Sequence, residues 1–244
     1  MNGGITFYKL YRWVYHILHF AIIYINGIIG KGEGIMSKIY TIGREFGSRG
    51  HVIGQKLAER LGIPYYDKEL LQQASKDSGF CQEIFENHDE RPTNSFLYSL
   101  VMDTYSGGSY SSAPFLDMPL NHKVFLAQFD TIKNLATEGD CVIVGRCADH
   151  ALSERPDVLN VFVHARMEDR IKTVSERENL TENKARDLIQ KKDKQRASYY
   201  NYYTNKKWGD SRSYDLCLST SILSVDDCVD LILCFREKMD QKKR

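Results

Sequence analysis

Short apolar runs alternate with amphipathic segments along most of the chain. The runs are rich in β-branched and aromatic residues and are too short for helices, so we interpret them as strands. Most of them are continuously apolar, which is typical of strands in a parallel sheet covered on both faces. The pattern therefore predicts an α/β fold. The predicted strands span residues 38–43, 63–67, 141–145, 158–165 and 214–221.

The segments between these strands carry apolar residues at helical spacing. The first of them places Ile53 and Leu57 on one face, as an amphipathic helix does. Gly79 is a suitable C-terminal stop for the second helix, and Ser224 is a natural N-cap for the last. The predicted helices span residues 51–61, 68–79, 122–139, 167–179, 181–203 and 224–239.

One internal segment breaks this alternation. Residues 80–120 show no clear periodicity, and their stretch YSGGSYSSAP is made largely of small residues that favour a connecting loop. We interpret this segment as an insertion in a single principal domain that spans residues 36–244.

The first 35 residues differ from the rest. Their longest uninterrupted apolar run, residues 21–25, is far shorter than the roughly 20 residues that a membrane-spanning helix needs. Residues 31–33 can be encoded as AAA GGA GAA, which contains a ribosome-binding sequence shortly before the codon for Met36. Our hypothesis is that translation starts at Met36 and that residues 1–35 are an upstream reading-frame artefact. A signal peptide and an interfacial or membrane-anchoring helix are the alternatives.

Composition narrows the class of protein. Apolar residues make up 42% and charged residues 27% of the 244 residues, and the net charge of +1 gives no reason to expect nucleic-acid binding. The six cysteines form no CxxC pair, so we interpret them as reduced core residues of a cytoplasmic protein. No membrane partner is expected unless residues 1–35 are part of the native chain. The sequence leaves the oligomeric state open.

A glycine-rich turn lies between the first strand and the first helix, in the stretch GREFGSRGH of residues 43–51. A strand, a glycine-rich turn and a helix in this order gather backbone amides and the positive end of the helix dipole around one point, which favours anions. The stretch lacks the lysine of the GxxxxGK[ST] phosphate loop. From these residues alone, a phosphate site and a structural turn remain equal alternatives.

Three separated motifs carry a family resemblance: GREFGSRGHVIGQKLAERLGIPYYDKELL, VGRCADHAL and DKQRASYYNYYTNKKWGDSRSYDLCLSTSILSV. In this order and at these separations they resemble the cytidylate kinase-like family of P-loop nucleoside monophosphate kinases, from about residue 38 to about residue 236. The resemblance implies a three-layer P-loop kinase sandwich with a five-stranded parallel sheet. It also implies a helical acceptor-binding insertion at about residues 68–120 and a small lid at about residues 190–212.

The resemblance implies transfer of the γ-phosphoryl group of ATP, with Mg²⁺, to a nucleoside monophosphate, with CMP or dCMP the leading acceptor. Two alternatives remain open. The chain could phosphorylate a different small acceptor, since the predicted acceptor segment departs most from true cytidylate kinases. It could also be a nucleotide-binding regulatory protein that has lost transfer activity, as the missing loop lysine would permit.

The resemblance assigns the glycine-rich turn to ATP. Either Arg49 or Arg44 would replace the missing lysine, since a guanidinium matches phosphate oxygens in a bidentate way; a solvent-exposed loop charge is the alternative for Arg49. Ser48 is the best hydroxyl for Mg²⁺, although it precedes the second glycine of the loop. The predicted ATP-binding residues are Gly43, Arg44, Gly47, Ser48, Arg49, Gly50 and His51.

The acceptor would be bound by residues that follow other strands. Arg146 comes directly after the strand 141–145 and resembles the arginine of a Gly-Arg-Asp pattern that contacts the acceptor, at the sheet edge where ligands bind in α/β folds. Asp149 would be the shifted acid of that pattern, with a surface ion pair as the alternative. Asp67 would orient the acceptor phosphate or hold magnesium-bound water, or it would cap a helix.

Charged residues near the predicted lid complete the set. Arg170 would reach phosphate, or it would pair with Glu168 or Asp169. Asp193 and Arg196 match the aspartate and arginine of the family's lid, and with Arg49 they are the predicted catalytic residues. The two arginines would stabilise the negative charge of the transferring phosphoryl group. The aromatic stretch YYNYY that follows would pack the lid helix or stack on a base.

Overall fold

The computed structural model describes residues 38–79, residue 90 and residues 119–242. The chain divides into two units, Met1–Ser37 and Lys38–Arg244, and the structure described below belongs to the second. The predicted N-terminal extension therefore lies outside the described residues. So does most of the predicted insertion, apart from the helix that begins it, Glu90 and the last two of its residues.

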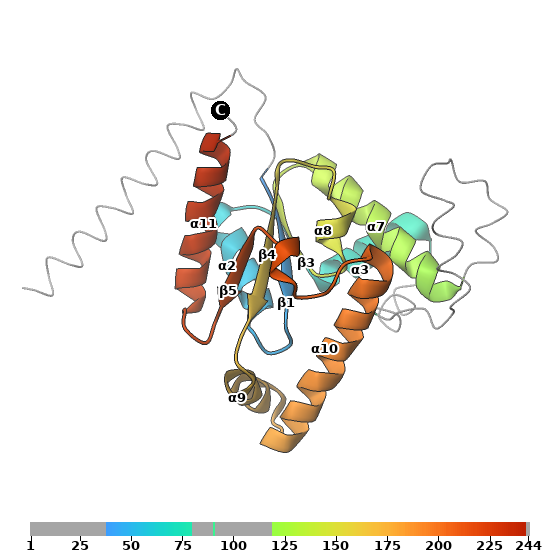
Figure 1. The fold of residues 1–244 in the computed structure, drawn as a ribbon. Coiled ribbons are helices and arrows are strands. Elements are labelled where there is room, and N and C mark those ends of the chain that lie inside the picture. Colours follow the sequence, from blue (N-terminus) through green and yellow to red (C-terminus); the bar gives the residue numbers. More distant parts are fainter. Residues whose placement is uncertain (1–37, 80–89, 91–118, 243–244) are drawn as a thin grey trace, which may run out of the picture. The chain divides into compact units, whose positions relative to one another are not determined.

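Five strands form one sheet, in the order β2-β3-β1-β4-β5, and every neighbouring pair is parallel (Figure 1). The predicted α/β fold with a five-stranded parallel sheet is confirmed. The second and last strands are much shorter than predicted, because only Tyr65–Tyr66 of the segment 63–67 and Leu216–Ser219 of the segment 214–221 pair with their neighbours. The strands are β1 (Ile39–Arg44), β2 (Tyr65–Tyr66), β3 (Cys141–Val144), β4 (Val158–His164) and β5 (Leu216–Ser219).

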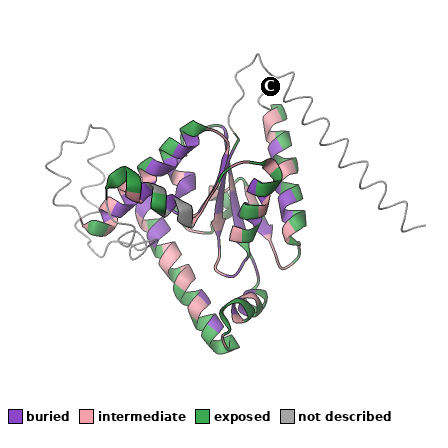
Figure 2. Cartoon of the chain, turned by 180° about the vertical axis from the view of Figure 1, so that it is seen from behind, coloured by how far each residue is buried: buried purple, intermediate pink, exposed green. Residues whose placement is uncertain are grey.

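Helices cover both faces of the sheet. The side chains of β1 alternate between the two faces, and both faces carry apolar residues that the helices bury. Ile42 belongs to a buried apolar cluster with α2 and α11, whereas Ile39 belongs to a second cluster with α3, α7 and α8. In Figure 2 the three central strands β1, β3 and β4 are mostly buried, and each helix has buried and exposed sides. These helices are α2 (Gly50–Leu61), α3 (Lys68–Ser78), α7 (Leu120–Glu138), α8 (Ala148–Ala151) and α11 (Val225–Lys242).

Two predicted helix ends are confirmed by their hydrogen bonds. The Ser224 hydroxyl accepts a hydrogen bond from the Asp227 amide at 3.1 Å, and the Asp227 carboxylate accepts one from the Ser224 amide at 3.0 Å. This reciprocal arrangement is a capping box. At the end of α3, Gly79 adopts the left-handed conformation and donates its amide to Ser75, as C-terminal glycines do.

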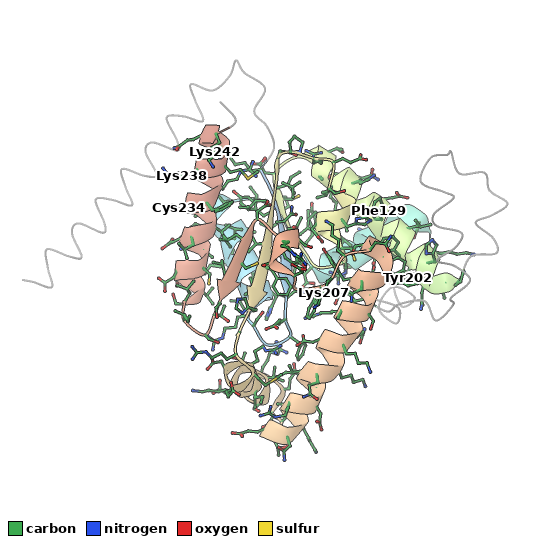
Figure 3. The ribbon with its side chains drawn as sticks, viewed as in Figure 1. Phe129, Tyr202, Lys207, Cys234, Lys238 and Lys242 are labelled. Atoms are coloured by element: carbon green, nitrogen blue, oxygen red, sulfur yellow. The ribbon has the colours of Figure 1, made fainter. Side chains whose placement is uncertain are left out.

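Two further helices lie beyond the carboxyl ends of the strands: α9 (Met167–Glu178) and α10 (Glu182–Thr204). Residues 190–204 of the predicted lid are the later part of α10, and the rest of the lid is a connection, residues 205–210, followed by the start of a short 3₁₀ helix, η1 (Ser211–Ser213). Tyr199 and Tyr203 are buried against Phe125 of α7, and the rings of Phe125 and Tyr203 stack at 3.8 Å between centroids. The aromatic stretch therefore packs the helix, and Figure 3 shows Tyr202 of the same stretch where α10 meets α7.

The five cysteines in the described residues are free thiols. Cys141, Cys147 and Cys228 are buried as predicted, but Cys217 and Cys234 are exposed. The core prediction was wrong for these two because β5 is the edge strand and Cys234 lies on the outward side of α11, as Figure 3 shows. Within the described residues, no helix is long and apolar enough to cross a membrane.

Candidate functional site

The glycine-rich turn between β1 and α2 requires glycine at two positions. Gly47 has a φ of 83°, and a Cβ atom there would lie 2.9 Å from the Val174 side chain. A Cβ atom on Gly50 would lie 2.5 Å from Cβ of Arg44, a distance that real Cβ atoms do not tolerate. The turn is therefore shaped by close backbone approach, and it delivers the first amides of α2, which have no acceptor inside the helix, to the edge of the sheet.

A carboxylate from α10 binds this turn. The Phe46 amide donates a hydrogen bond to Asp193 at 2.8 Å, and Arg170 of α9 forms an ion pair with the same carboxylate. Arg170 also lies 3.5 Å from the Glu45 carboxylate. These contacts tie the turn to α9 and α10. They also show that Arg170 pairs with Glu45 and Asp193 and not with its sequence neighbours.

Ser48, the predicted magnesium ligand, is fully buried. Its hydroxyl donates a hydrogen bond to the Glu45 carbonyl at 2.9 Å, so this conformation does not present it to a metal. The residues that the structure describes hold no group of three or more histidine, cysteine, aspartate or glutamate side chains placed to bind a metal. Mg²⁺ is commonly bound through substrate phosphates and one or two carboxylates, so the ATP phosphates would supply ligands that Ser48 does not supply in this conformation.

The two candidates for the missing lysine are placed differently. Arg49 is exposed and sits at the N-cap of α2 in the left-handed conformation, with a φ of 63°. Arg44 is buried at the end of β1, with 8% of its surface exposed. His51 is half-buried behind the turn, where burial and the charge of Arg177 lower its pKa. Arg49 thus faces the open side of the turn, and Arg44 faces the interior.

Three arginines converge at the carboxyl edge of the sheet. Arg44 ends β1, Arg146 follows β3, and Arg196 reaches the same point from α10. The first two strands are neighbours in a parallel sheet, so their carboxyl ends meet at one edge. Arg44 and Arg146 are buried, and only 15% of the Arg196 side chain is exposed. Three buried like charges at one point require counter-ions.

Glu90 and Asp67 supply those counter-ions. One Glu90 oxygen accepts from Nη1 of Arg44 at 2.8 Å and from the Arg146 amide at 3.4 Å, and the other accepts from Nε of Arg196 at 2.9 Å. Asp67 lies 3.1 Å from Nη1 of Arg146 and 3.8 Å from Nη2 of Arg44. Burial opposes ionisation of Glu90, but the three guanidiniums outweigh it and hold the pKa of Glu90 well below its usual range.

The turn after β3 is strained. Gly145, Arg146 and Cys147 are consecutive and all left-handed, with φ of 76°, 53° and 56°. Such a conformation costs a non-glycine residue about 1–2 kcal/mol. A Cβ atom on Gly145 would lie 1.9 Å from the Arg44 guanidinium. The strain directs the Arg146 amide at Glu90, and strain of this kind concentrates at binding and catalytic sites.

The back of the site is aromatic and acidic. Asp149 is buried and accepts a hydrogen bond from the Tyr200 hydroxyl at 2.6 Å. Burial raises the pKa of Asp149, and the Tyr200 hydrogen bond opposes that shift. The remaining cavity is only about 20 Å³, which is room for about one water molecule. Residues of β1, α8 and α10 line it together with Glu90 and loop residues, among them Thr41, Asp149, Tyr200, Arg146, Trp208 and Tyr214.

The structure brings together some predicted site residues and separates others. Around the cavity it gathers Gly43, Arg44, Asp67, Arg146, Asp149 and Arg196. Asp193 and Arg170 lie together against the turn, and Arg49, Ser48 and His51 are not part of the cavity lining. Asp67 occupies the N-cap position of α3 but makes no capping hydrogen bond, and Asp149 is no surface residue.

Glu90 is the main residue that the sequence did not indicate. It lies in the segment 80–120, where neither periodicity nor a family motif marks any acid. The available signal was charge balance, because several arginines predicted near one site indicate that carboxylates lie close to them, without indicating which. Tyr200, Trp208 and Tyr214 also line the cavity; the sequence left packing and base stacking open for the stretch that contains Tyr200.

Comparisons with known proteins agree with this geometry. A family model described as the cytidylate kinase-like family matches residues 39–222. A cytidylate kinase from Methanopyrus kandleri is 23% identical over 206 residues, which cover 81% of this chain and 92% of that protein. A crystal structure of an uncharacterized protein from Eubacterium ventriosum is 32% identical and has a TM-score of 0.62, covering 82% of this chain and 98% of that one.

A shikimate kinase from Bacteroides thetaiotaomicron is 12% identical, with a TM-score of 0.48 and coverage of 82% of this chain and 98% of that one. The family model covers most of the residues that form the sheet and the site. The glycine-rich turn, the arginine after β3 and the Asp193–Arg196 segment all lie within the matched range. The chain belongs to the cytidylate kinase-like family.

Proposed function

We propose that the chain is an ATP-dependent phosphotransferase that phosphorylates a small acceptor, with CMP or dCMP the leading acceptor. The observation that carries this proposal is the convergence of Arg44, Arg146 and Arg196 in a buried pocket beside the glycine-rich turn. Phosphoryl transfer requires little covalent chemistry from a protein and depends on placed positive charge. Family membership supports the same reaction class.

The turn and the start of α2 would hold the ATP phosphates. Free amides at a helix N-terminus and the helix dipole both favour anions, and the close approaches at Gly47 and Gly50 fit a backbone cradle. Arg49 is the exposed cation at this end of α2, so we assign it the phosphate contact that a loop lysine would make. Mg²⁺ bound to the ATP phosphates would neutralise part of their charge.

The buried residues would act on the acceptor and on the transferring group. Arg196 and Arg44 would contact the acceptor's phosphate and stabilise oxygens that gain charge in the transition state, in a pocket that excludes most water. Arg146, held by Asp67 at 3.1 Å, would bind the acceptor. Asp193 would fix the turn through the Phe46 amide. No residue of this set has to form a covalent intermediate.

One observation favours a second function, nucleotide binding without transfer. Glu90 and Asp67 offset most of the positive charge of the arginine pocket, the pocket is nearly filled by its own side chains, and the turn lacks a lysine. A protein in this state would bind ATP at the turn and would phosphorylate nothing.

The test is an assay of ADP release by the full chain with ATP, Mg²⁺ and a panel of nucleoside monophosphates. We expect ADP formation that depends on CMP or dCMP and is absent without an acceptor. Thermal stabilisation by ATP without turnover of any acceptor would favour the regulatory alternative. Absence of both ATP binding and turnover would refute both functions.

A further inference from the structure

We propose that the Glu90 carboxylate occupies the position of a phosphate group in the arginine pocket, and that the acceptor's phosphate binds by replacing it. This inference rests on the proposed function, because it names how the acceptor of that reaction is recognised. The ligand class is a phosphate monoester dianion.

The contacts of Glu90 are those of a bound oxyanion. Its two oxygens accept hydrogen bonds from two guanidiniums and one backbone amide, contributed by β1, α10 and the strained turn after β3. Guanidinium forks combined with left-handed backbone amides form anion sites for phosphate. Three elements far apart in the sequence therefore converge on one carboxylate, although nothing in their own packing requires it.

The space in the pocket permits replacement but not addition. A cavity of about 20 Å³ beside Glu90 holds about one water molecule, whereas a phosphate group has four oxygens around a phosphorus atom. A phosphate cannot reach the donors of Arg44 and Arg196 while Glu90 occupies them. It reaches them when the carboxylate leaves.

The charges give the same result. Arg44, Arg146 and Arg196 pair with Glu90 and Asp67, so these five side chains together carry one surplus positive charge. A phosphate dianion that replaced Glu90 would neutralise this set, whereas Asp149, which also lines the cavity, accepts a hydrogen bond from Tyr200. A dianion added without release of Glu90 would place two more negative charges beside three carboxylates in a buried site, which is costly.

The backbone of Glu90 is held in an unfavourable conformation. Its φ is 50°, a left-handed value that few non-glycine residues adopt. The contacts of the carboxylate compensate for that strain, and release of the carboxylate removes it, which lowers the cost of the exchange. Since the guanidiniums keep the pKa of Glu90 well below its usual range, protonation does not empty the position near neutral pH.

An internal competitor of this kind selects its ligand. The apparent affinity of any anion is reduced by the fraction of molecules in which Glu90 fills the pocket. A monoanion that replaced Glu90 would carry the same charge as the carboxylate and would gain little binding energy. A dianion carries a second negative charge, which the arginines attract. The pocket thereby distinguishes phosphate monoesters from singly charged carboxylates.

The test is calorimetric titration of wild type and of Glu90→Gln with inorganic phosphate, CMP and cytidine. We expect Glu90→Gln to bind phosphate and CMP about tenfold more tightly, with cytidine unchanged. Glu182→Gln removes an exposed acid at the start of α10 and is the control for net charge, with affinities like wild type. Weaker or unchanged phosphate binding by Glu90→Gln would overturn the proposal and identify Glu90 as a residue that orients the arginines.

A second variant, Glu90→Asp, distinguishes the effect of filling the phosphate position from the effect of the negative charge at residue 90. Glu90→Asp keeps the negative charge but shortens its reach to the donors, so we expect phosphate affinity between those of wild type and Glu90→Gln. An affinity equal to wild type would overturn the proposal. A titration with ATP and Mg²⁺ identifies the source of the phosphate, because tightening for ATP without tightening for CMP would overturn the assignment to the acceptor.

Folding of the variants is part of the test. If Glu90→Gln is unfolded in phosphate-free buffer, phosphate at high concentration should restore a cooperative thermal transition, because it can take the carboxylate's place. A variant that stays unfolded with phosphate would overturn the proposal. The readout is binding, so a wild-type protein that turns over no acceptor would refute the proposed function and leave the binding result intact.

Discussion

Helix α10 is charged over most of its length and aromatic over its last turns, and the two parts hold the molecule together in different ways. Before Tyr199, the helix meets the site through polar side chains: Asp193 binds the Phe46 amide, and Arg196 donates to Glu90 and to the Arg44 carbonyl. From Tyr199 onward it is buried against α7. The polar part provides the chemistry, and the aromatic part provides the anchor.

The difference shows how the cation of the site is positioned. Arg196 precedes Tyr199 and Tyr200 by about one helical turn, and both tyrosines are buried. The guanidinium is therefore held by packing that lies outside the pocket. A cation that is fixed in advance stabilises developing charge without reorganisation at the moment of reaction.

The largest effect is expected at the polar part, from Arg196→Lys. Lysine keeps the charge but lacks Nε and the planar fork that reaches Glu90 and the Arg44 carbonyl. We expect kcat with ATP and the preferred acceptor to fall about 100- to 1,000-fold, measured by ADP release. Arg186→Lys changes an exposed arginine of the same helix and should leave kcat unchanged. Wild-type kcat in Arg196→Lys would remove Arg196 from the catalytic set.

The aromatic part is tested by Tyr203→Ala. Tyr203 is 6% exposed and stacks on Phe125 of α7, so its removal leaves a cavity in the anchor. We expect the free energy of unfolding to fall by about 3 kcal/mol, measured by urea denaturation. Ser198→Ala, at an exposed position of the same helix, should change it little. A loss below about 1 kcal/mol would mean that the aromatic cluster does not anchor α10.

A smaller effect is expected from Asp193→Ala, which releases the turn from the polar part of α10. The Phe46 amide would lose its acceptor, and Arg170 would lose one of its two carboxylate partners. We expect the KM for ATP to rise about tenfold, since the loss of one hydrogen bond to a charged group is worth about 1.5 kcal/mol or more, with a smaller change in kcat. Asp187→Ala, an exposed acid of the same helix, is the control. A change in kcat alone would place Asp193 at the transferring group.

The sequence predicted the anchored parts of the molecule better than the pocket. Strand and helix positions follow from periodicity, because apolar residues such as Ile39 and Ile42 bury the same way whatever lies far along the chain. The glycine-rich turn and Arg146 could also be predicted, since each directly follows a strand of a parallel sheet. The turn and Arg146 lie at the same edge of the sheet because the strands before them are parallel, and the sequence predicted a parallel sheet.

The pairing inside the pocket could not be predicted. Glu90 is defined by three donors from residues 44, 146 and 196, and no local pattern encodes a contact among four separate segments. The same holds for Tyr200, which packing statistics place in a core and which also donates to Asp149. Asp193 and Arg196 were predicted together as two positions of the lid motif, but the motif did not indicate their ion-pair partners, which are Arg170 and Glu90.

The smallest effect concerns Tyr200, where the anchor meets the pocket. Burial raises the pKa of Asp149 above its ordinary 3.8, and the Tyr200 hydroxyl opposes this by donating to the ionised form. A carboxyl whose pKa is raised by folding contributes most stability at acid pH, and this contribution is lost as pH rises from 3.8 through the folded value. Tyr200→Phe removes the donor and raises the pKa of Asp149 further.

We therefore expect Tyr200→Phe to lower the free energy of unfolding by about 1 kcal/mol at pH 7, with the loss shrinking as the pH falls and Asp149 becomes protonated. Urea denaturation of both proteins at several pH values measures this difference. His150 titrates nearby with a pKa lowered by burial, but it is common to both proteins and cancels to first order. A decrease in the free energy of unfolding that stays constant with pH would show that the hydroxyl does not stabilise the ionised Asp149. Tyr200 would then belong to the aromatic part of α10 alone.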